Sequence, residues 1–400
     1  MRKLLIAIFM LAAFTACDKD DSPQKPEGAV DRTVLIYMAA ENNLTNWSNS
    51  KKGYYADRDL AEIKIGARSI GNNNLLVYVD KADTIPPYLL YFWQNELRDS
   101  IPMPESKTSD PAVLESIARK AFTDYPANSY GLVLWGHANG WYIKNDSVKY
   151  TSMARRKAYG GDTGNNTTSG SGKSWMNLPS MATALSHLPH LDFIFADCCN
   201  MMCVECAYEL KDVTDYYISS PAEIPAQGAP YNTVVPAMME KTTFWSSIVD
   251  KYFEQTTEDL GNRVPLAVIK TSEMNNLANA TRTILQSIDA EQEIAPYPDL
   301  IGLIYYYDNE YYDMNNFILE YASEAEYNSW KKVFDDAVIY SKMATKWDSN
   351  DVDFSDFNMN ETTFGGVSMF IPRVFLQWSE NKTIKQMKWY YAAGYSDIGW

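Results

Sequence analysis

Two short apolar segments of the chain end in side chains that can carry out nucleophilic chemistry. The run Gly131–Trp135 is followed by His137. The run Leu191–Phe195 leads through Ala-Asp-Cys to Cys199. A cysteine reacts as its thiolate, which a helix N-terminus or a nearby imidazolium favours. Cys199 stands where a strand gives way to the helical pattern Val204–Leu210, so a helix dipole is available to it.

Histidine is scarce, with three residues in the whole chain. His187 and His190 flank Pro189 at the end of a helical pattern, where capping or surface roles suit them. His137 lies at a strand end among small residues that would let a substrate approach. A packed, hydrogen-bonded histidine is the alternative. The pattern therefore indicates His137 as the candidate partner of Cys199.

Acyl transfer also needs donors for a developing oxyanion. Backbone N–H groups are sufficient for this task, so the side chain at the position can be as small as alanine. The N–H groups of Ala138 and Cys199 lie at the two candidate strand ends. We predict that these two amides form the oxyanion hole.

Four of the five cysteines crowd between residues 198 and 206. A disulfide framework would spread its cysteines to close long loops. Cys199, Cys203 and Cys206 have the C-x3-C-x2-C spacing of radical-SAM iron–sulfur sites, and zinc is a second alternative. On a helix these positions share one face, so small buried hydrophobes are the plainer interpretation. An exported chain meets oxygen, which disfavours a labile iron–sulfur cluster. We predict no metal at these cysteines.

The elements around these residues must hold them at one edge of a sheet. Five segments are short, β-branched or aromatic and bounded by polar residues, which favours buried strands: Thr33–Ala39, Leu75–Val79, Tyr88–Trp93, Gly131–Trp135 and Leu191–Phe195. Helical patterns alternate with them: Pro111–Phe122 with Asp110 as its N-cap, Leu178–Leu188, and Val204–Leu210. This alternation predicts an α/β fold with a mostly parallel sheet and helices on both faces. Ligands of such sheets bind beyond the carboxyl ends of the strands.

One stretch, Asn145–Ser174, interrupts the alternation. It contains Arg155-Arg156-Lys157 and then a run of Gly, Ser, Thr and Asn, which predicts a long exposed loop. Apolar runs return at residues 265–270 and 366–372, with tyrosine-rich helical patterns between them. These tyrosines favour core and interface packing, with a carbohydrate platform as the alternative.

The N-terminus has the pattern of a targeting segment. Residues 1–16 contain Arg2 and Lys3 and then an apolar run, which predicts a signal peptide too short to span a bilayer. The ending Phe-Thr-Ala-Cys17 is typical of a bacterial lipobox, although Phe14 replaces the more usual Leu. We expect cleavage before Cys17 and lipidation of its thiol; ordinary cleavage beside an incidental cysteine is the alternative. Residues 17–30 then form a flexible tether. The predicted location is the cell envelope, facing the periplasm or the cell surface.

The composition limits the partners. The 400 residues carry a formal charge of −16, which repels polyphosphates and anionic headgroups and so disfavours nucleic acid and membrane surfaces as partners. We expect protein or peptide substrates, a monomer, contact with the membrane through the lipid anchor only, and no cofactor. A calcium requirement stays open, because acidic loops are plentiful but none has the spaced ligands of a calcium loop.

Several blocks of the chain, in order and over nearly its whole mature length, resemble the clostripain family of cysteine peptidases. These blocks are Leu35–Leu44 (LIYMAAENNL), Leu134–Trp141 (LWGHANGW), Asp197–Cys199, Val204–Leu210, Glu223–Tyr231 and Gly366–Pro372. The departures are Glu41 for Asp, Ala138 for Gly, and Ala226 and Ala229 where Gly and Trp are usual.

The resemblance implies a caspase-like α/β fold, with a catalytic domain over residues 31–260 and a C-terminal subdomain over 261–400 packed on it. It also implies a Cys–His dyad of Cys199 and His137, because Cys198 falls where the family has a small Ala. Cleavage after Arg or Lys follows, with Asp197 and Glu223 binding the substrate; for Asp197 a role in the strand-to-helix turn is the alternative.

The resemblance further implies maturation by cleavage in the 145–174 loop. We expect the cut beside Arg155, Arg156 or Lys157, and a merely solvated basic loop is the alternative. A catalytically silent surface lipoprotein that binds peptide or glycan on the same fold is the alternative to the enzyme as a whole.

Overall fold

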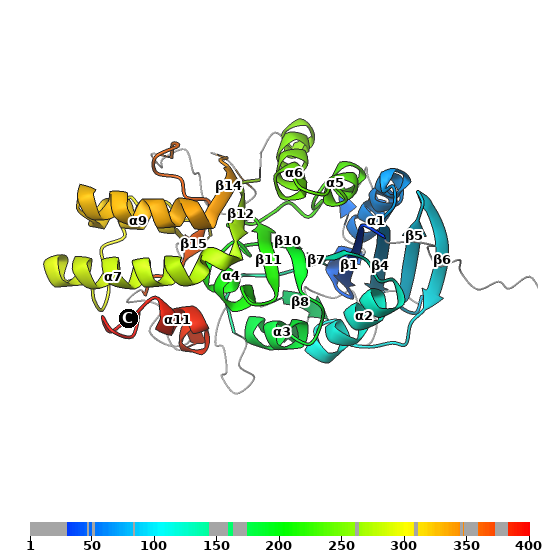
Figure 1. The fold of residues 1–400 in the computed structure, drawn as a ribbon, viewed down its shortest axis with the longest axis horizontal. Helices are drawn as coiled ribbons and strands as arrows, with labels where there is room; N and C mark the ends of the chain where they lie inside the picture. Colours follow the sequence, from blue (N-terminus) through cyan, green and yellow to red (C-terminus); the bar gives the residue numbers. More distant parts are fainter. Residues whose placement is uncertain are drawn as a thin grey trace, which may run out of the picture.

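A nine-stranded sheet forms the centre of the protein in the computed structural model (Figure 1). The structure describes residues 30–45, 48–49, 53–82, 85–143, 159–162, 174–260, 264–307, 311–344, 347, 359–372 and 383–400. The strand order is β14-β12-β11-β10-β7-β1-β4-β5-β6. The bounds are β1 Arg32–Ala40, β4 Asn74–Lys81, β5 Tyr88–Trp93, β6 Glu96–Pro102, β7 Ser129–Trp135, β10 Leu191–Asp197, β11 Thr214–Ser219, β12 Leu266–Lys270 and β14 Val338–Lys342.

The centre of the sheet is parallel and its flanks are antiparallel. Strands β4, β1, β7, β10 and β11 run parallel to one another, whereas β5, β6, β12 and β14 pair in antiparallel fashion. The central strands are continuous apolar runs because both of their faces are buried. All five strands that the sequence predicts are present, and the predicted fold class is confirmed. Strand β11 (TDYYIS) is among the strands that the sequence analysis did not predict. The polar residues at its start hide its apolar end.

Helices cover both faces of the sheet (Figure 1). One face carries α1 (Tyr55–Gly66), α5 (Tyr231–Met238) and α6 (Phe244–Leu260). The other carries α2 (Pro111–Asp124), α3 (Leu178–Leu185), α4 (Val204–Leu210) and α11 (Lys388–Ala392). Helices α7 (Met274–Gln292) and α9 (Glu324–Ala337) pack on each other near the β14 edge, where Trp330 Nε1 donates to Thr281 Oγ1 at 3.1 Å. The remaining short elements are β2 Ser48–Asn49, β3 Gly53–Tyr54, β8 Tyr159–Asp162, β9 Ser174–Met176, β13 Tyr312–Asp313, α8 Met314–Tyr321 and β15 Ser368–Met369.

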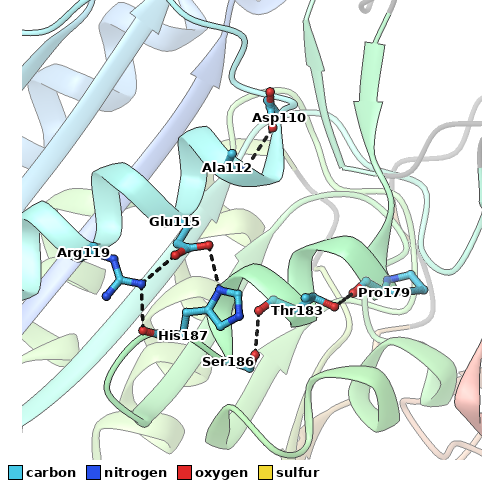
Figure 2. Close-up of polar contacts among 8 residues, drawn as sticks. All are labelled: Asp110, Ala112, Glu115, Arg119, Pro179, Thr183, Ser186 and His187. Atoms are coloured by element: carbon cyan, nitrogen blue, oxygen red, sulfur yellow. Dashed lines mark hydrogen bonds and ion pairs between the residues drawn. The ribbon is translucent and has the colours of Figure 1, made fainter.

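Helix α2 begins as its sequence predicts. Asp110 has extended backbone angles, and its side chain accepts a hydrogen bond from the N–H of Ala112 at 2.9 Å (Figure 2). The next helix on this face, α3, ends at Leu185, three residues before the predicted end. The chain beyond α3 is held to α2 by His187, whose Nδ1 lies 3.0 Å from Glu115 Oε2.

The prediction of an exposed loop over residues 145–174 is wrong for part of this stretch. Residues Tyr159–Asp162 form β8, which pairs with β9 and is buried. The Tyr159 hydroxyl donates to the carbonyl oxygens of Tyr37 and Trp135, each at 3.2 Å. A four-residue strand with two glycines lacks an apolar pattern, so the surrounding polar sequence concealed it.

The C-terminal part of the chain extends the central sheet through β12 and β14 and reaches back to α4. The Ser368 N–H donates to Met202 O at 3.0 Å, and the Phe370 N–H donates to Glu205 Oε1 at 2.7 Å. These contacts fit the predicted packing of residues 261–400 on the rest; the boundary itself stays a prediction. Within the described residues, no helix is both long and apolar enough to cross a membrane.

Candidate active site

The strand register brings His137 and Cys199 to the same edge of the sheet. Strands β7 and β10 are parallel neighbours in which Trp135 pairs with Asp197. His137 and Cys199 each follow two residues after that pair, at the carboxyl ends of the two strands. This edge lies next to β1, where the strand order reverses direction, and ligands of open α/β sheets bind at such points.

The two neighbouring cysteines have different surroundings. Cys198 is fully buried, and its thiol donates to the carbonyl oxygen of Leu134 at 3.1 Å. Burial raises the pKa of the Cys198 thiol well above its usual value, and the charge of Asp197 adds to this effect. Cys199 is partly exposed, and its Sγ lies 3.8 Å from Ile224 O. Cys199 is therefore the thiol that a substrate can reach.

The His137 ring is held by a residue that follows β1. Its Nε2 lies 2.7 Å from Asn43 Oδ1. Because an amide oxygen only accepts, this contact puts the proton on Nε2 and leaves Nδ1 unprotonated. A ring in this tautomer can take a proton from a thiol through Nδ1. The Trp175 ring, with its centroid 6.5 Å from that of His137, lies beside it.

Gly136 explains how the chain turns directly after β7. Its φ of +144° lies in a region that side chains disfavour, and a Cβ at this position would lie 3.0 Å from the carbonyl oxygen of Ala39. The glycine therefore lets the loop that carries His137 pass close to the end of β1. That proximity brings His137 within reach of Asn43.

The loops after β7 and β10 are fastened to each other. Asn200 Nδ2 donates to Asn139 Oδ1 at 2.7 Å, and the Tyr311 hydroxyl donates to Asn139 O at 2.5 Å. Gly140 adopts φ +62°, and a Cβ there would lie 2.7 Å from Asn200 O. These contacts fix the two loops that carry His137 and Cys199 relative to one another.

The predicted oxyanion donors lie on the same two loops. Ala138 forms an isolated antiparallel bridge with Tyr159. A hydrogen bond of this bridge runs from the Gly160 N–H to His137 O at 2.8 Å, so it does not use the Ala138 N–H. The arrangement is compatible with an anion-binding role for the Ala138 amide.

Asp197 lies beneath the nucleophile candidate and accepts three hydrogen bonds. Its Oδ2 accepts from the Ala229 N–H at 2.9 Å and from the Tyr231 hydroxyl at 2.8 Å. Its Oδ1 accepts from the Tyr252 hydroxyl at 3.0 Å. Burial raises the pKa of the Asp197 carboxyl, and these donors oppose the shift. Since a carboxylate offers about four acceptor positions, one remains on Oδ1.

A second buried carboxyl group, Asp59 of α1, lies close to Asp197. A Cβ on Gly228 would lie 2.9 Å from Asp197 Oδ2 and 3.1 Å from Asp59 Oδ2. The Trp135 indole N–H donates to Asp59 Oδ2 at 2.7 Å, whereas Asp59 Oδ1 is buried without a hydrogen-bond partner. Burial and the charge of Asp197 raise the pKa of the Asp59 carboxyl. The region below Gly228 is therefore acidic.

The remaining predicted residues fall in different places. Glu223 is half-buried and directly precedes Ile224, whose carbonyl oxygen contacts Cys199. Cys17, Arg155, Arg156 and Lys157 lie outside the described residues.

The other two histidines are on the surface, as the sequence predicts. His187 contacts Glu115, and His190 Nε2 lies 2.9 Å from Asp215 Oδ1. Their side chains are more than half exposed, at 53% and 52%. Both are far too exposed to act in the buried loops described above.

The metal alternatives for the cysteines find no support in the thiol geometry. The Cys203 thiol donates to Cys206 Sγ at 3.1 Å, while Cys199 contacts Ile224. Within the described part of the chain, the group whose ligand atoms lie close enough to hold an ion is Glu41, Asp80 and Glu105.

Three contributors to the site escaped the sequence analysis. Asn43 lies 94 residues from His137, and Tyr231 and Tyr252 lie 34 and 55 residues from Asp197. Asn43 had one usable signal, since it follows the predicted strand Thr33–Ala39 at the same sheet edge. Tyr231 closes the family-like block Glu223–Tyr231, although nothing in the sequence indicates its contact with Asp197, and Tyr252 carried no signal.

Comparisons of this chain with a family model and with solved structures agree with each other. A model of the clostripain family matches residues 36–400. A search of curated proteins found no match. Among solved structures, a secreted cysteine protease of this family from Bacteroides thetaiotaomicron, in complex with an irreversible peptide inhibitor, is 30% identical with a TM-score of 0.73. The match covers 92% of this chain and 99% of that chain.

Two further structures are similar. An inactive zymogen protease of the same family from Parabacteroides distasonis is 28% identical with a TM-score of 0.72, over 92% of this chain and 99% of that one. A cysteine protease from B. fragilis is 35% identical with a TM-score of 0.51, over 57% of this chain and 97% of that one.

Proposed function

The chain belongs to the clostripain family of cysteine peptidases, and we propose that it is an exported endopeptidase that cleaves after Arg or Lys through a dyad of Cys199 and His137. The observation that carries the proposal is the pair of neighbouring strand ends. A partly exposed thiol and a ring with its proton on Nε2 follow two residues after a paired position of β7 and β10.

In the proposed reaction, His137 Nδ1 takes the thiol proton of Cys199, and the thiolate attacks the scissile carbonyl carbon. The Ala138 and Cys199 amides stabilise the resulting oxyanion. The imidazolium then gives its proton to the leaving amine, and an acyl-enzyme remains on the sulfur. Water, deprotonated by the same ring, releases the carboxylic acid product. Asn43 sets the tautomer of the neutral ring, and its amide oxygen accepts from Nε2–H in the imidazolium as well.

The proposed specificity rests on Asp197, one of the two buried carboxyl groups below Gly228. The free acceptor position of Asp197 would bind a substrate guanidinium or ammonium by one charge-assisted hydrogen bond. Three of the four positions are already used, so a bidentate Arg fork is not available, and we expect only a small preference between Arg and Lys. Glu223, in the loop that contacts Cys199, supplies a second negative charge at the rim.

Self-processing in the 145–174 loop is the next part of the proposal. Tyr159 bridges Ala138, beside His137. In the sequence, the basic residues Arg155, Arg156 and Lys157 precede Tyr159 by two to four positions. One similar structure is that of an inactive zymogen, which agrees with maturation by cleavage.

We also propose that the mature protein begins at an acylated Cys17. The lipobox-like ending of the signal segment supports this, and one similar protease is described as secreted. Mass spectrometry of detergent-extracted protein tests the anchor. An unmodified Cys17 within an intact leader would rule it out.

The peptidase proposal is tested with an acyloxymethyl ketone that carries Arg or Lys. Such a compound alkylates the nucleophilic sulfur of a cysteine peptidase. We expect covalent labelling of the wild type and of Cys198→Ala, and no labelling of Cys199→Ala. The Cys198→Ala variant is the matched control, since it removes the adjacent thiol. Labelling that survives in Cys199→Ala would reject Cys199 as the nucleophile.

A further inference from the structure

Two cysteines that the proposed reaction does not use lie against each other at the start of α4. The Sγ atoms of Cys203 and Cys206 are 3.1 Å apart, and neither side chain is exposed. Non-bonded carbon atoms prefer separations of about 3.5–4.0 Å, and sulfur is larger than carbon. The two thiols are therefore in close contact within the fold.

We propose that Cys203 and Cys206 form a disulfide when the chain folds in an oxidising compartment. A disulfide bond measures about 2.05 Å, so the sulfur atoms need to approach by only about 1 Å. Cys203 is the N-cap of α4, with φ −108° and ψ 145°, and Cys206 is the third helical residue. The backbone of the N-cap is extended, while its carbonyl oxygen accepts the first hydrogen bond of the helix from the Ala207 N–H at 3.2 Å. The inference uses the export in the proposed function but not the peptidase activity.

The oxidant is a small-molecule or protein disulfide. One cysteine thiolate attacks a sulfur of that disulfide, which releases one thiol and leaves a mixed disulfide. The second cysteine then displaces the remaining half as another thiol. The two cysteines together lose two protons and two electrons, and the oxidant disulfide is reduced to two thiols.

The fold dictates when this exchange takes place. Burial raises the pKa of the Cys206 thiol well above its usual value, so the folded pair reacts poorly. Ser368 of β15 covers the start of α4 through a bridge with Cys203 and a hydrogen bond from its N–H to Met202 O. The exchange therefore takes place before β15 docks. After docking, the buried disulfide is protected from reduction.

The disulfide has a consequence for the nucleophile. In an oxidising compartment, Cys199 competes with three nearby thiols for pairing. A bond between Cys203 and Cys206 removes two of these competitors, and Cys198 is held by Leu134 O. The short loop that the bond closes adds little stability. Its effect is to keep Cys199 reduced and available for catalysis.

Cleavage with cyanogen bromide places Cys203 and Cys206 together on one peptide. The full chain, with its own leader, is expressed for export to a bacterial periplasm, denatured in N-ethylmaleimide and cleaved at methionine. Cleavage after Met202 and Met238 yields fragment 203–238, which contains Cys203 and Cys206 and no other cysteine. We expect this fragment to carry no label, to be lighter than the dithiol by two hydrogen atoms, and to take two labels after reduction. Two labels without reduction would overturn the proposal.

Single and double variants test the consequence for Cys199. In Cys206→Ser the remaining thiol of Cys203 can pair with Cys199, so peptidase activity should rise severalfold on addition of a reductant. Cys203→Ser/Cys206→Ser lacks both competitors and should not respond. An equal response of the two variants would contradict the protective role. The label count on the wild-type fragment needs no activity, so it decides the disulfide even if the peptidase proposal fails.

Discussion

At the scale of single residues, the orientation of His137 depends on a partner that is distant in sequence. Asn43 accepts from Nε2 at 2.7 Å and so sets which nitrogen can act as a base. We regard Asn43 as a positioning residue, because its side-chain oxygen holds the His137 ring. The close approach of the His137 loop to the end of β1, which Gly136 allows, brings the two side chains together.

The first prediction concerns Asn43. Asn43→Ala removes one hydrogen bond, worth about 1.4 kcal/mol, and should lower kcat about tenfold with little change in KM. Asn43→Asp keeps an acceptor and adds a negative charge that favours the imidazolium. Because the neutral ring must accept the thiol proton, the acidic limb of its pH–activity profile should shift to higher pH. If Asn43 had only a structural role, the alanine variant would lose stability and the aspartate profile would not move.

The second prediction concerns Asp197. Asp197→Asn should reduce the preference for Arg over Ala substrates by roughly 2 kcal/mol, about 30-fold in kcat/KM, because a charge-assisted hydrogen bond becomes a neutral one. Asp59→Asn is the matched control, since it alters a second buried carboxyl beside Gly228. It should leave the preference intact. An unchanged Arg-to-Ala ratio in Asp197→Asn would assign Asp197 to the turn instead.

The sequence points to the candidate dyad more directly than to the residues that contact it. Cys199 and His137 stand at the ends of two apolar runs, and local sequence reveals such positions. Tyr231 and Tyr252 lie on helices and reach Asp197 only through the packing of α5 and α6. Their role depends on tertiary contacts that no local pattern encodes.

At the scale of elements, α4 connects the nucleophile loop to the C-terminal part of the chain. Glu205 is fully buried on this helix, and its Oε1 accepts from the Phe370 N–H at 2.7 Å. Its Oε2 has no hydrogen-bond partner. Burial is the main cause that raises the pKa of Glu205 to about 7. The contact between α4 and the segment after β15 is therefore sensitive to pH.

The third prediction follows from the sign of that shift. The pKa of Glu205 is higher in the folded state than its unfolded value near 4.5, so its contribution to stability is fully present below pH 4.5. This contribution is lost as the pH rises through about 7. Over that window the free energy of unfolding should fall by about 3 kcal/mol from this group alone. Glu205→Gln should flatten this part of the profile, measured by denaturant unfolding from pH 4.5 to 8. Identical slopes in the two proteins would refute the assignment.

The elements also show where sequence patterns fail. The five predicted strands are continuous apolar runs and all form, because burial on both faces leaves a strong signal. Strand β8, with the sequence YGGD, has no such signal. It forms because Tyr159 fits between β1 and β7, where two carbonyl oxygens accept its hydroxyl. Tertiary contacts rather than local propensity determine that strand.

At the scale of the whole molecule, the catalytic strands are joined by the basic stretch that the proposal assigns to self-cleavage. The fourth prediction is that the soluble chain from Asp18 onward yields two tightly associated fragments on incubation, while Cys199→Ala stays whole. The fragments should remain together because β7 of the first fragment pairs with β10 of the second, and the Tyr159 hydroxyl of the second donates to Tyr37 O and Trp135 O of the first. N-terminal sequencing locates the cut, which we expect beside Arg155, Arg156 or Lys157. Equal yields of fragments from both proteins would assign the cut to another protease.

The account as a whole depends on Cys199 and His137 acting as one catalytic unit on adjacent strands. The most direct test is kcat/KM for the wild type, Cys199→Ala, His137→Ala and the double variant, measured on a peptide with Arg before the cleaved bond. Members of one unit are non-additive, so each single variant should lose several orders of magnitude and the double variant little more. A His137→Ala protein with wild-type kcat/KM, or losses that multiply in the double variant, would contradict the dyad.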